Sequence, residues 1–371
     1  MTAVEASEIE QERGDRDADP RGSAATLPRH VTVIGGAGYV GSVLIRKLLR
    51  QIPAVTVMDA LMFGDEGVRD LMDEPGFNVV RGDLRDIESI VRSLRDADAV
   101  VHLGGLVGDP ACALDESLTM EINMESTRMI AETARGLGVE RFVFASSCAV
   151  YGATDELLDE ESALAPVSVY ARSKMESERL LLDLADETFA PSILRFGTFF
   201  GLSPRNRFDL VVNMLTAKAV TEGGITVFGG GQWRPFVHVE DGSEAIVRCL
   251  AAPIETVRGR VYNVGSDEEN HTMLEVADRI AALVPGALVI REPAAKEEPN
   301  YRVSFRRIRE ELGFVAEHSL DDAVLEIVDA IHAGEVEDYK DARYSNYASM
   351  TNGAGTVLRR RREAVRLEEA G

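Results

Sequence analysis

The chain has 371 residues, with 40 Lys or Arg against 63 Asp or Glu, so its formal net charge at pH 7 is −23. A field of that sign repels nucleic acids and anionic membrane surfaces. No apolar run is long enough to cross a membrane, and the N-terminus lacks the hydrophobic core of a signal peptide. The 3 cysteines show no C-x-x-C spacing, which argues against a disulfide framework and a zinc site. We therefore predict a cytoplasmic protein, long enough for two lobes, with no nucleic-acid or membrane partner.

The two ends of the chain differ from the middle in composition. Residues 1–27 combine Glu, Asp, Arg, Gly and Ala with almost no large apolar side chains, so we expect a disordered acidic segment. Residues 346–371 are expected to form a polar tail. The arginine run at 359–362 is followed by glutamates, and we interpret it as a solvated helix or tail.

Strands and helices alternate between these ends. Short apolar runs rich in β-branched residues predict strands at 30–34, 55–58, 79–84, 99–105, 141–147 and 191–196. Helical spacing predicts helices from about residue 38, at 116–138 and at 168–185. This rhythm predicts an α/β fold with a doubly wound parallel sheet of the Rossmann type over 28–197, joined by about 236–265. Residues 198–235 and 266–345, which include a helix expected at 207–222, would form a smaller C-terminal α/β substrate lobe at the carboxyl edge of the sheet.

The first strand ends in a glycine-rich turn, where Gly35, Gly38 and Gly41 have the spacing G-x-x-G-x-x-G. The first glycine permits a tight turn, the second lets a pyrophosphate approach the backbone, and the third lets the helix pack close to the strand. Asp59 ends the second strand about 20 residues later, where an acid accepts the ribose hydroxyls of a dinucleotide. The alternative for Asp59 is a cap on the next turn. Because a carboxylate repels a 2′-phosphate, the pattern predicts NAD in preference to NADP.

Tyr170 and Lys174 are four residues apart on a predicted helix and therefore share one face. A tyrosine that exchanges a proton near neutral pH needs a stabilised phenolate, which a neighbouring ammonium provides by lowering the pKa. Ser147, at the end of the fifth predicted strand, can donate a hydrogen bond to the same substrate oxygen. A tyrosine with a solvated lysine four residues on is common, so the pair alone is weak evidence for catalysis. The dinucleotide fold predicted before it supports the catalytic interpretation.

Several motifs in this order resemble an extended short-chain dehydrogenase/reductase of the NAD-dependent epimerase/dehydratase family, which includes UDP-galactose 4-epimerase. The motifs are Gly-Gly-Ala-Gly-Tyr-Val-Gly (35–41), Asp59, Arg-Gly-Asp-Leu (81–84), Val-His-Leu-Gly-Gly (101–105), Asn123, Ser-Ser-Cys-Ala-Val-Tyr-Gly (146–152), Tyr170-x-x-x-Lys174, Leu-Arg-Phe (194–196) and Arg-Pro-Phe-Val-His-Val (234–239). The resemblance covers about residues 30 to 320.

The resemblance implies a role for each matching residue. Ser147, Tyr170 and Lys174 would be catalytic, with Tyr170 removing a hydroxyl proton while hydride leaves the same carbon for the nicotinamide. The residues implied to bind the cofactor, NAD, are Gly35, Gly38, Tyr39, Val40, Gly41, Asp59, Asp83, Leu84, Leu103, Gly104, Gly105, Asn123, Ala145, Tyr170, Lys174 and Phe196. The residues implied to bind the substrate, a nucleotide-diphosphate sugar, are Ser147, Cys148, Thr198, Arg234 and Arg302. The two arginines would hold the diphosphate, the alternative being salt bridges to surface carboxylates. No metal is implied.

The leading interpretation is an NAD-dependent nucleotide-sugar epimerase that transiently oxidises a sugar hydroxyl, most simply at C4, to a ketone. The alternatives are an oxidoreductase or dehydratase of the same substrates, and a non-catalytic NAD-binding regulator. In relatives that eliminate water, an Asp-Glu pair follows the triad hydroxyl, but here Cys148 and Ala149 stand there. Thr198 stands where many relatives have Asn.

The resemblance also predicts a homodimer in which helices 116–137 and 168–187 pair across a two-fold axis into a four-helix bundle. The apolar residues expected to supply the interface are Met120, Met124, Ile130, Leu180, Leu181 and Leu184.

Overall fold

The structure is a computed structural model that describes residues 27–294, 300–354 and 358. The expectation of disorder at 1–27, apart from Leu27, and the arginine run at 359–362 therefore lie outside the described residues. Within these ranges no helix is both long and apolar enough to cross a membrane.

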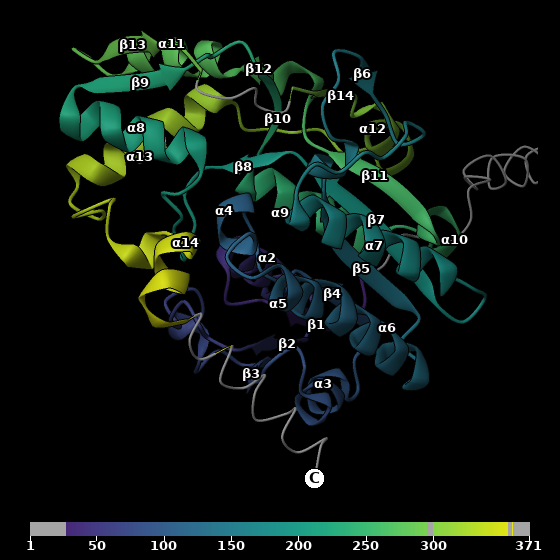
Figure 1. Cartoon of the computed structure of the whole chain (residues 1–371). Helices are drawn as coiled ribbons and strands as arrows, with labels where there is room; N and C mark the ends of the chain where they lie inside the picture. The colour runs from purple at the N-terminus through teal and green to yellow at the C-terminus, as the bar shows by residue number, and fades with distance from the viewer. Residues whose placement is uncertain (1–26, 295–299, 355–357, 359–371) are drawn as a thin grey trace, which may run out of the picture.

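A seven-stranded parallel sheet forms the centre of the molecule (Figure 1), in the order β11-β7-β5-β4-β1-β2-β3. Its strands are β1 (His30–Ile34), β2 (Ala54–Asp59), β3 (Phe77–Arg81), β4 (Ala99–His102), β5 (Arg141–Ser147), β7 (Ala190–Phe196) and β11 (Arg260–Val264). Each neighbouring pair is parallel. The Rossmann-type sheet predicted from the sequence is thus confirmed.

Helices cover both faces of this sheet, because successive side chains of a strand point to opposite sides. On β1, Val31 and Val33 pack with α2 (Tyr39–Leu49) and α9 (Val239–Ala251). Ile34 packs on the other face, with α3 (Ile87–Leu94), α6 (Ser126–Gly136) and α7 (Val169–Asp183). The strand residues are therefore apolar on both sides, as expected of a parallel sheet.

A second group of elements is formed by residues after β7, together with β6 from before it. Its strands are β8 (Thr198–Phe200), β10 (Trp233–His238) and β12 (Asn270–Thr272) in one sheet, the parallel pair β9 (Gly224–Phe228) and β13 (Leu288–Glu292), and the parallel pair β6 (Leu157–Leu158) and β14 (Arg302–Val303). Its helices are α8 (Val211–Glu222), α11 (Met273–Leu283), α12 (Arg306–Leu312) and α13 (Leu320–His332), and the short α10 (Ile254–Val257) precedes β11. Phe200, Leu215, Ile225 and Ile280 belong to the separate apolar core of this lobe.

Three elements differ from the expectation. The helix predicted at 116–138 consists of α5 (Glu116–Met120), a π-helical turn η2 (Glu121–Glu125) and α6. The helix predicted at 207–222 starts at Val211, after the extended N-cap residue Leu210, and the Arg207 guanidinium binds Asp209 at 2.9 Å in the loop before it. The expected polar tail contains α14 (Asn346–Ser349) and a second π-helical turn, η6 (Met350–Ala354). Met350 and Leu358 are buried there, because these two isolated apolar side chains pack on the nucleotide-binding lobe.

Candidate active site

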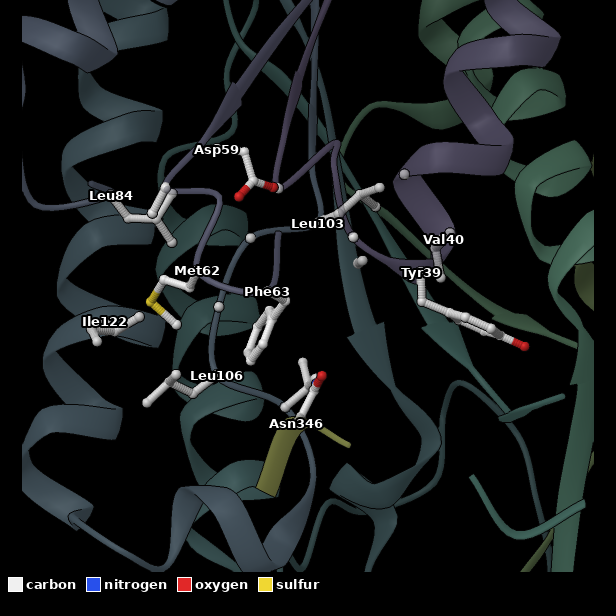
Figure 2. A pocket seen from close by; sticks show the side chains of 18 of the residues that line it. Tyr39, Val40, Asp59, Met62, Phe63, Leu84, Leu103, Leu106, Ile122 and Asn346 are labelled. Atoms are coloured by element: carbon white, nitrogen blue, oxygen red, sulfur yellow. The ribbon is translucent and has the colours of Figure 1, made fainter. Parts of the chain in front are cut away.

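The pocket lies at the carboxyl ends of the central strands, where the strand order reverses. Ile34 of β1 is in register with Met58 of β2 and His102 of β4, so the residues that follow these three meet at one edge. Open α/β sheets bind their ligands at such a switch point. The pocket and the solvent at its mouth together occupy about 1250 Å³, and the pocket is seen from close by in Figure 2.

Glycine is required at two positions of the turn after β1. Gly35 has φ +76°, and a Cβ there would lie 2.6 Å from the Gly104 Cα at the end of β4. A Cβ on Gly41 would lie 2.5 Å from the Gly36 carbonyl oxygen, so α2 could not pack this close to the turn. Gly38 is the N-cap of α2 and provides no side-chain cap. The helix therefore offers amides and a positive dipole end to an anion such as a pyrophosphate.

The Asp59 carboxylate lies beside this turn. It accepts hydrogen bonds from the Ala37 amide at 3.1 Å and the Leu61 amide at 2.8 Å. Burial nevertheless raises the pKa of Asp59 above its usual value. The Arg205 guanidinium acts in the opposite direction on this pKa, which places a cation near the acid. The carboxylate is thus fixed at the pocket wall, where it can accept ribose hydroxyls.

An apolar slot continues from Asp59. The side chains of Met62, Leu84, Leu106 and Ile122 line it and face one another in Figure 2. Such a slot suits a flat apolar ring like adenine.

Asp83 ends this slot, and its carboxylate binds the Arg85 guanidinium at 2.9 and 3.0 Å. Arg85 also bonds Glu121 at 2.8 Å.

Of the predicted catalytic residues, Tyr170 and Lys174 line this pocket, and Ser147 ends β5 next to the lining residue Ser146. The Tyr170 ring also packs against the apolar cluster that includes Leu106 and Ile122. Ser168 caps α7 by accepting a hydrogen bond from the Ala171 amide at 3.1 Å, which sets the first turn carrying Tyr170. The Ser147 hydroxyl accepts a hydrogen bond from the Ala149 amide at 3.2 Å and lies close enough to the Tyr170 phenol to lower its pKa. The Lys174 ammonium donates to the Ala145 carbonyl at 2.7 Å and lies 6.0 Å from the centre of the Tyr170 ring.

The pKa values of this pair differ from the expectation. Burial raises the pKa of Tyr170, while the Ser147 hydroxyl and the Arg207 guanidinium lower it by less. Burial also lowers the pKa of Lys174 to about 8. Burial therefore outweighs the lowering of the tyrosine pKa expected from Lys174, whose ammonium is turned to the Ala145 carbonyl.

The structure places 15 of the 16 predicted cofactor residues around this pocket, the exception being Asn123. The 15 are Gly35, Gly38, Tyr39, Val40, Gly41, Asp59, Asp83, Leu84, Leu103, Gly104, Gly105, Ala145, Tyr170, Lys174 and Phe196. Asn123 lies behind the wall, in the π-helical turn, and bonds both the amide and the carbonyl of Leu106 at 2.7 and 2.9 Å. It therefore supports the loop after β4. The Tyr39 phenol points away and donates to the Gly201 carbonyl at 2.6 Å, so this residue offers its backbone to the pocket.

The predicted substrate residues are divided. Cys148 does not reach the pocket, because its thiol is buried and donates to the Arg195 carbonyl at 3.2 Å. Burial raises the pKa of this thiol, so it is not a reactive group. Thr198 starts β8, beside the pocket residue Phe199, but is not itself a lining residue among those the structure describes.

Two predicted arginines lie on neighbouring strands and stack on aromatic rings. The Arg234 guanidinium lies 5.3 Å from the Tyr301 ring centre, and that of Arg302 lies 5.3 Å from the Trp233 ring centre. Arg302 also donates to the Asp155 carbonyl at 3.3 Å. Surface salt bridges were the alternative for these residues, and the structure records none to Arg302 from the residues it describes.

Comparison with known proteins agrees with this geometry. Residues 31–265 match the model of the NAD dependent epimerase/dehydratase family. The chain belongs to this family. The membership confirms the resemblance in the sequence and, with it, NAD as the cofactor.

The similarity to individual members of this family extends over most of the chain. The UDP-glucose 4-epimerase of Lactobacillus helveticus is 27% identical over 335 residues, which cover 84% of this chain and 99% of that protein. The structure of MoeE5 in complex with UDP-glucuronic acid and NAD is 27% identical, with a TM-score of 0.71 over 82% of this chain and 99% of that one. The dTDP-glucose 4,6-dehydratase DesIV of Streptomyces venezuelae, solved with NAD bound, is 25% identical, with a TM-score of 0.74 over 82% and 98% of the two chains.

The sequence analysis did not identify several residues that line the pocket of this protein. They are Met58, Ala60, Met62, Phe63, Leu106, Val107, Ile122, Ser146, Phe199, Arg205, Arg207, Asn346 and Leu358. Arg205 is 5% exposed, and burial lowers the pKa of its guanidinium to about 10. The two closely spaced arginines of the loop 201–210, which also contains Asp209, were the signal that could have identified Arg205 and Arg207. Among the described residues, no group of three or more His, Cys, Asp or Glu could hold a metal ion.

Proposed function

We propose that the protein is an NAD-dependent epimerase of a nucleotide-diphosphate sugar, which oxidises a sugar hydroxyl, at C4 in the simplest case, and returns the hydride to the opposite face. The position of Tyr170 and Lys174 in the wall of a dinucleotide pocket, with the Ser147 hydroxyl near the Tyr170 phenol, supports this activity. We place the reaction in the cytoplasm, where free buried thiols such as the three of this chain persist.

The chain's own residues would handle the proton. Tyr170 takes the proton of the sugar hydroxyl and later returns it, while the Ser147 hydroxyl holds the same oxygen. Lys174 would orient the cofactor ribose and keep a positive charge near the tyrosine. NAD, when bound, supplies the hydride acceptor. Asp59 would hold the adenosine ribose, and the amides at the start of α2 the pyrophosphate.

The residues after Ser147 favour epimerisation over loss of water. Cys148 is turned into the core and Ala149 carries no acid, so neither can serve as the acid–base pair of a dehydratase. Among the described residues lining the pocket, the carboxylates are Asp59 and Asp83. The carboxylate whose charge acts on Tyr170 is that of Asp109, which is outside this lining and accepts a hydrogen bond from the Ser168 hydroxyl at 2.7 Å. The replacement of the acid pair by Cys148, whose thiol is turned into the core, and by Ala149 is the observation that carries the choice.

The test is an assay of purified protein with UDP-glucose, UDP-glucuronic acid, UDP-arabinose and dTDP-glucose. An epimerase gives a product of unchanged mass, separable by chromatography, with no net change in NADH absorbance. A product lighter by one water would instead show a dehydratase, and stoichiometric NADH an oxidoreductase. Tyr170→Phe is the matched control, because it keeps the ring and removes the ionisable oxygen.

Substrate binding is proposed for the two stacked arginines. Arg234 and Arg302 would hold the diphosphate, since guanidinium groups pair well with phosphate oxygens. Replacing either by Lys should raise KM for the nucleotide sugar more than it lowers kcat. Unchanged KM in both variants would assign the pair to folding alone.

We also propose a homodimer, although fewer of the expected apolar side chains are available for its interface than the sequence suggested. Of the six expected interface residues, Ile130 and Leu181 are used inside the chain's own core. The same helices carry exposed ion pairs, including Arg172–Glu116 at 3.3 Å and Arg179–Glu176 at 3.0 Å. An interface there would be partly ionic, so sedimentation at micromolar concentration should show a dimer that weakens with added salt. A monomer at low salt would contradict it.

A further inference from the structure

The end of the described chain lies over the cofactor pocket. Residues 346–354 and Leu358 lie beyond the family match, which ends at residue 265. In Figure 1 the yellow helix α14 stands beside the nucleotide-binding lobe, and in Figure 2 Asn346 lies at the pocket opposite Phe63. Asn346 and Leu358 both line the pocket, so this segment forms part of its wall.

Asn346 fixes one side of this wall through a buried arginine. Its side-chain oxygen accepts a hydrogen bond from the Arg205 guanidinium at 2.7 Å, and its backbone amide donates to the Asp209 carboxylate at 3.0 Å. Arg205 stacks over the Phe63 ring at 4.7 Å. Asp209 also binds the guanidinium of Arg207. The segment therefore holds both pocket arginines in place.

Leu358 closes the other side, at the apolar slot. Its side chain is 4% exposed and packs in one cluster with Leu106 and Ile122, which line the slot. Its carbonyl accepts a hydrogen bond from the Arg85 guanidinium at 3.3 Å, and Arg85 binds Asp83 at the end of the slot. Met350, 5% exposed, belongs to the same cluster.

We propose that residues 346–354 with Leu358 act as a strap that completes the adenosine half of the NAD site and limits the rate at which NAD leaves. The strap is attached at two places, to Arg205 and to Arg85, on either side of the pocket. Both attachments and the burial of Met350 and Leu358 must be lost before this wall can open. A segment that opens locally in this way sets a kinetic barrier to exchange without contributing to the hydride or proton transfer.

Two shortened chains test the strap. A variant ending at Ser345 lacks it, and a matched control ending at Arg359 keeps it. After removal of bound nucleotide and a check of folding by circular dichroism, NAD is titrated and its release followed in a stopped-flow chase. We expect the shorter variant to release NAD at least about tenfold faster, and the control to stay within about twofold of the full chain. Equal release from all three chains would overturn the proposal, as would slower release from the shorter variant, which would make the segment a plug.

Hydrogen exchange on the full chain gives an independent measurement if the shorter variant does not fold. Amides of 346–354 should exchange more slowly when NAD is added, because the bound cofactor and the strap hold each other closed. The amides of α13, which lies in the other lobe, serve as the internal control. Unchanged exchange in 346–354 would overturn the proposal without any truncation.

Discussion

Replacing Lys174 by Met should stabilise the NAD-free protein while it damages catalysis. Lys174 is 3% exposed, and burial lowers the pKa of its ammonium from 10.5 to about 8. This difference corresponds to a cost of about 3 kcal/mol for the charged side chain in the folded state at neutral pH. Lys174→Met removes that cost and keeps the length of the side chain. It also loses the hydrogen bond from the ammonium to Ala145, worth about 1.5–3 kcal/mol, so we expect a net gain of up to about 1.5 kcal/mol in the free energy of unfolding.

The pH dependence distinguishes this effect from a simple gain in packing. Below about pH 8 the lysine is protonated in both states and the folded state carries the full cost. Between the folded and the unfolded pKa the folded state has lost the proton and the unfolded chain keeps it, so wild-type stability rises with pH relative to the variant. Urea denaturation of both proteins at pH 7 and pH 10 measures this. The reasoning fails if Lys174→Met is less stable at pH 7, or if its advantage is the same at both pH values.

Three further outcomes are expected. Tyr170→Phe should lower kcat by about 10²–10⁴-fold with unchanged NAD binding, and retention of more than about a tenth of the activity would exclude Tyr170 as the base. Asp59→Asn should weaken NAD binding and reduce discrimination against NADP in parallel titrations. Because burial raises the pKa of Asp59, wild-type affinity for NAD should fall on acidification at a higher pH than for an exposed carboxyl, and the variant should lack this fall. Glu178 and Arg195 form a buried ion pair at 2.7 Å, so Glu178→Gln alone should lower the free energy of unfolding by about 3–5 kcal/mol. The double variant Glu178→Leu, Arg195→Met should lose less than the sum of the two single changes. Additive losses would show that the pair is not coupled.

The parts of the site that could be predicted are those encoded locally. A glycine turn between a strand and a helix determines its own geometry, and the positive φ of Gly35 is what that turn requires. Tyr170 and Lys174 share a helix, and a parallel sheet brings the end of each strand to the same edge. Hence Asp59 and Ser147 could be placed without knowledge of the lobe that follows.

The missing parts are those that depend on contacts distant in sequence. Arg205 reaches the Asp59 side of the pocket only because the loop after β8 folds back over α2. The strap was expected to be a polar tail, since Met350 and Leu358 are too few to show a periodic pattern. Leu358 is buried because the adenosine slot offers it an apolar surface, which a sequence pattern does not reveal. The side-chain direction of Cys148 was likewise set by the Arg195 carbonyl of the neighbouring strand.

The raised pKa of Tyr170 and the lowered pKa of Lys174 bear on how the pocket holds the proton during the reaction. Burial favours the neutral phenol of Tyr170, while Lys174, with its pKa lowered to about 8, still carries its proton at pH 7. Ionisation of Tyr170 therefore needs positive charge close by, and the Arg207 guanidinium is one source that the fold provides. Once the proton of the sugar hydroxyl has reached the phenolate, burial keeps it there. The proton is thus held until the ketone is reduced again, as an epimerase requires, since it must return both proton and hydride before the product leaves.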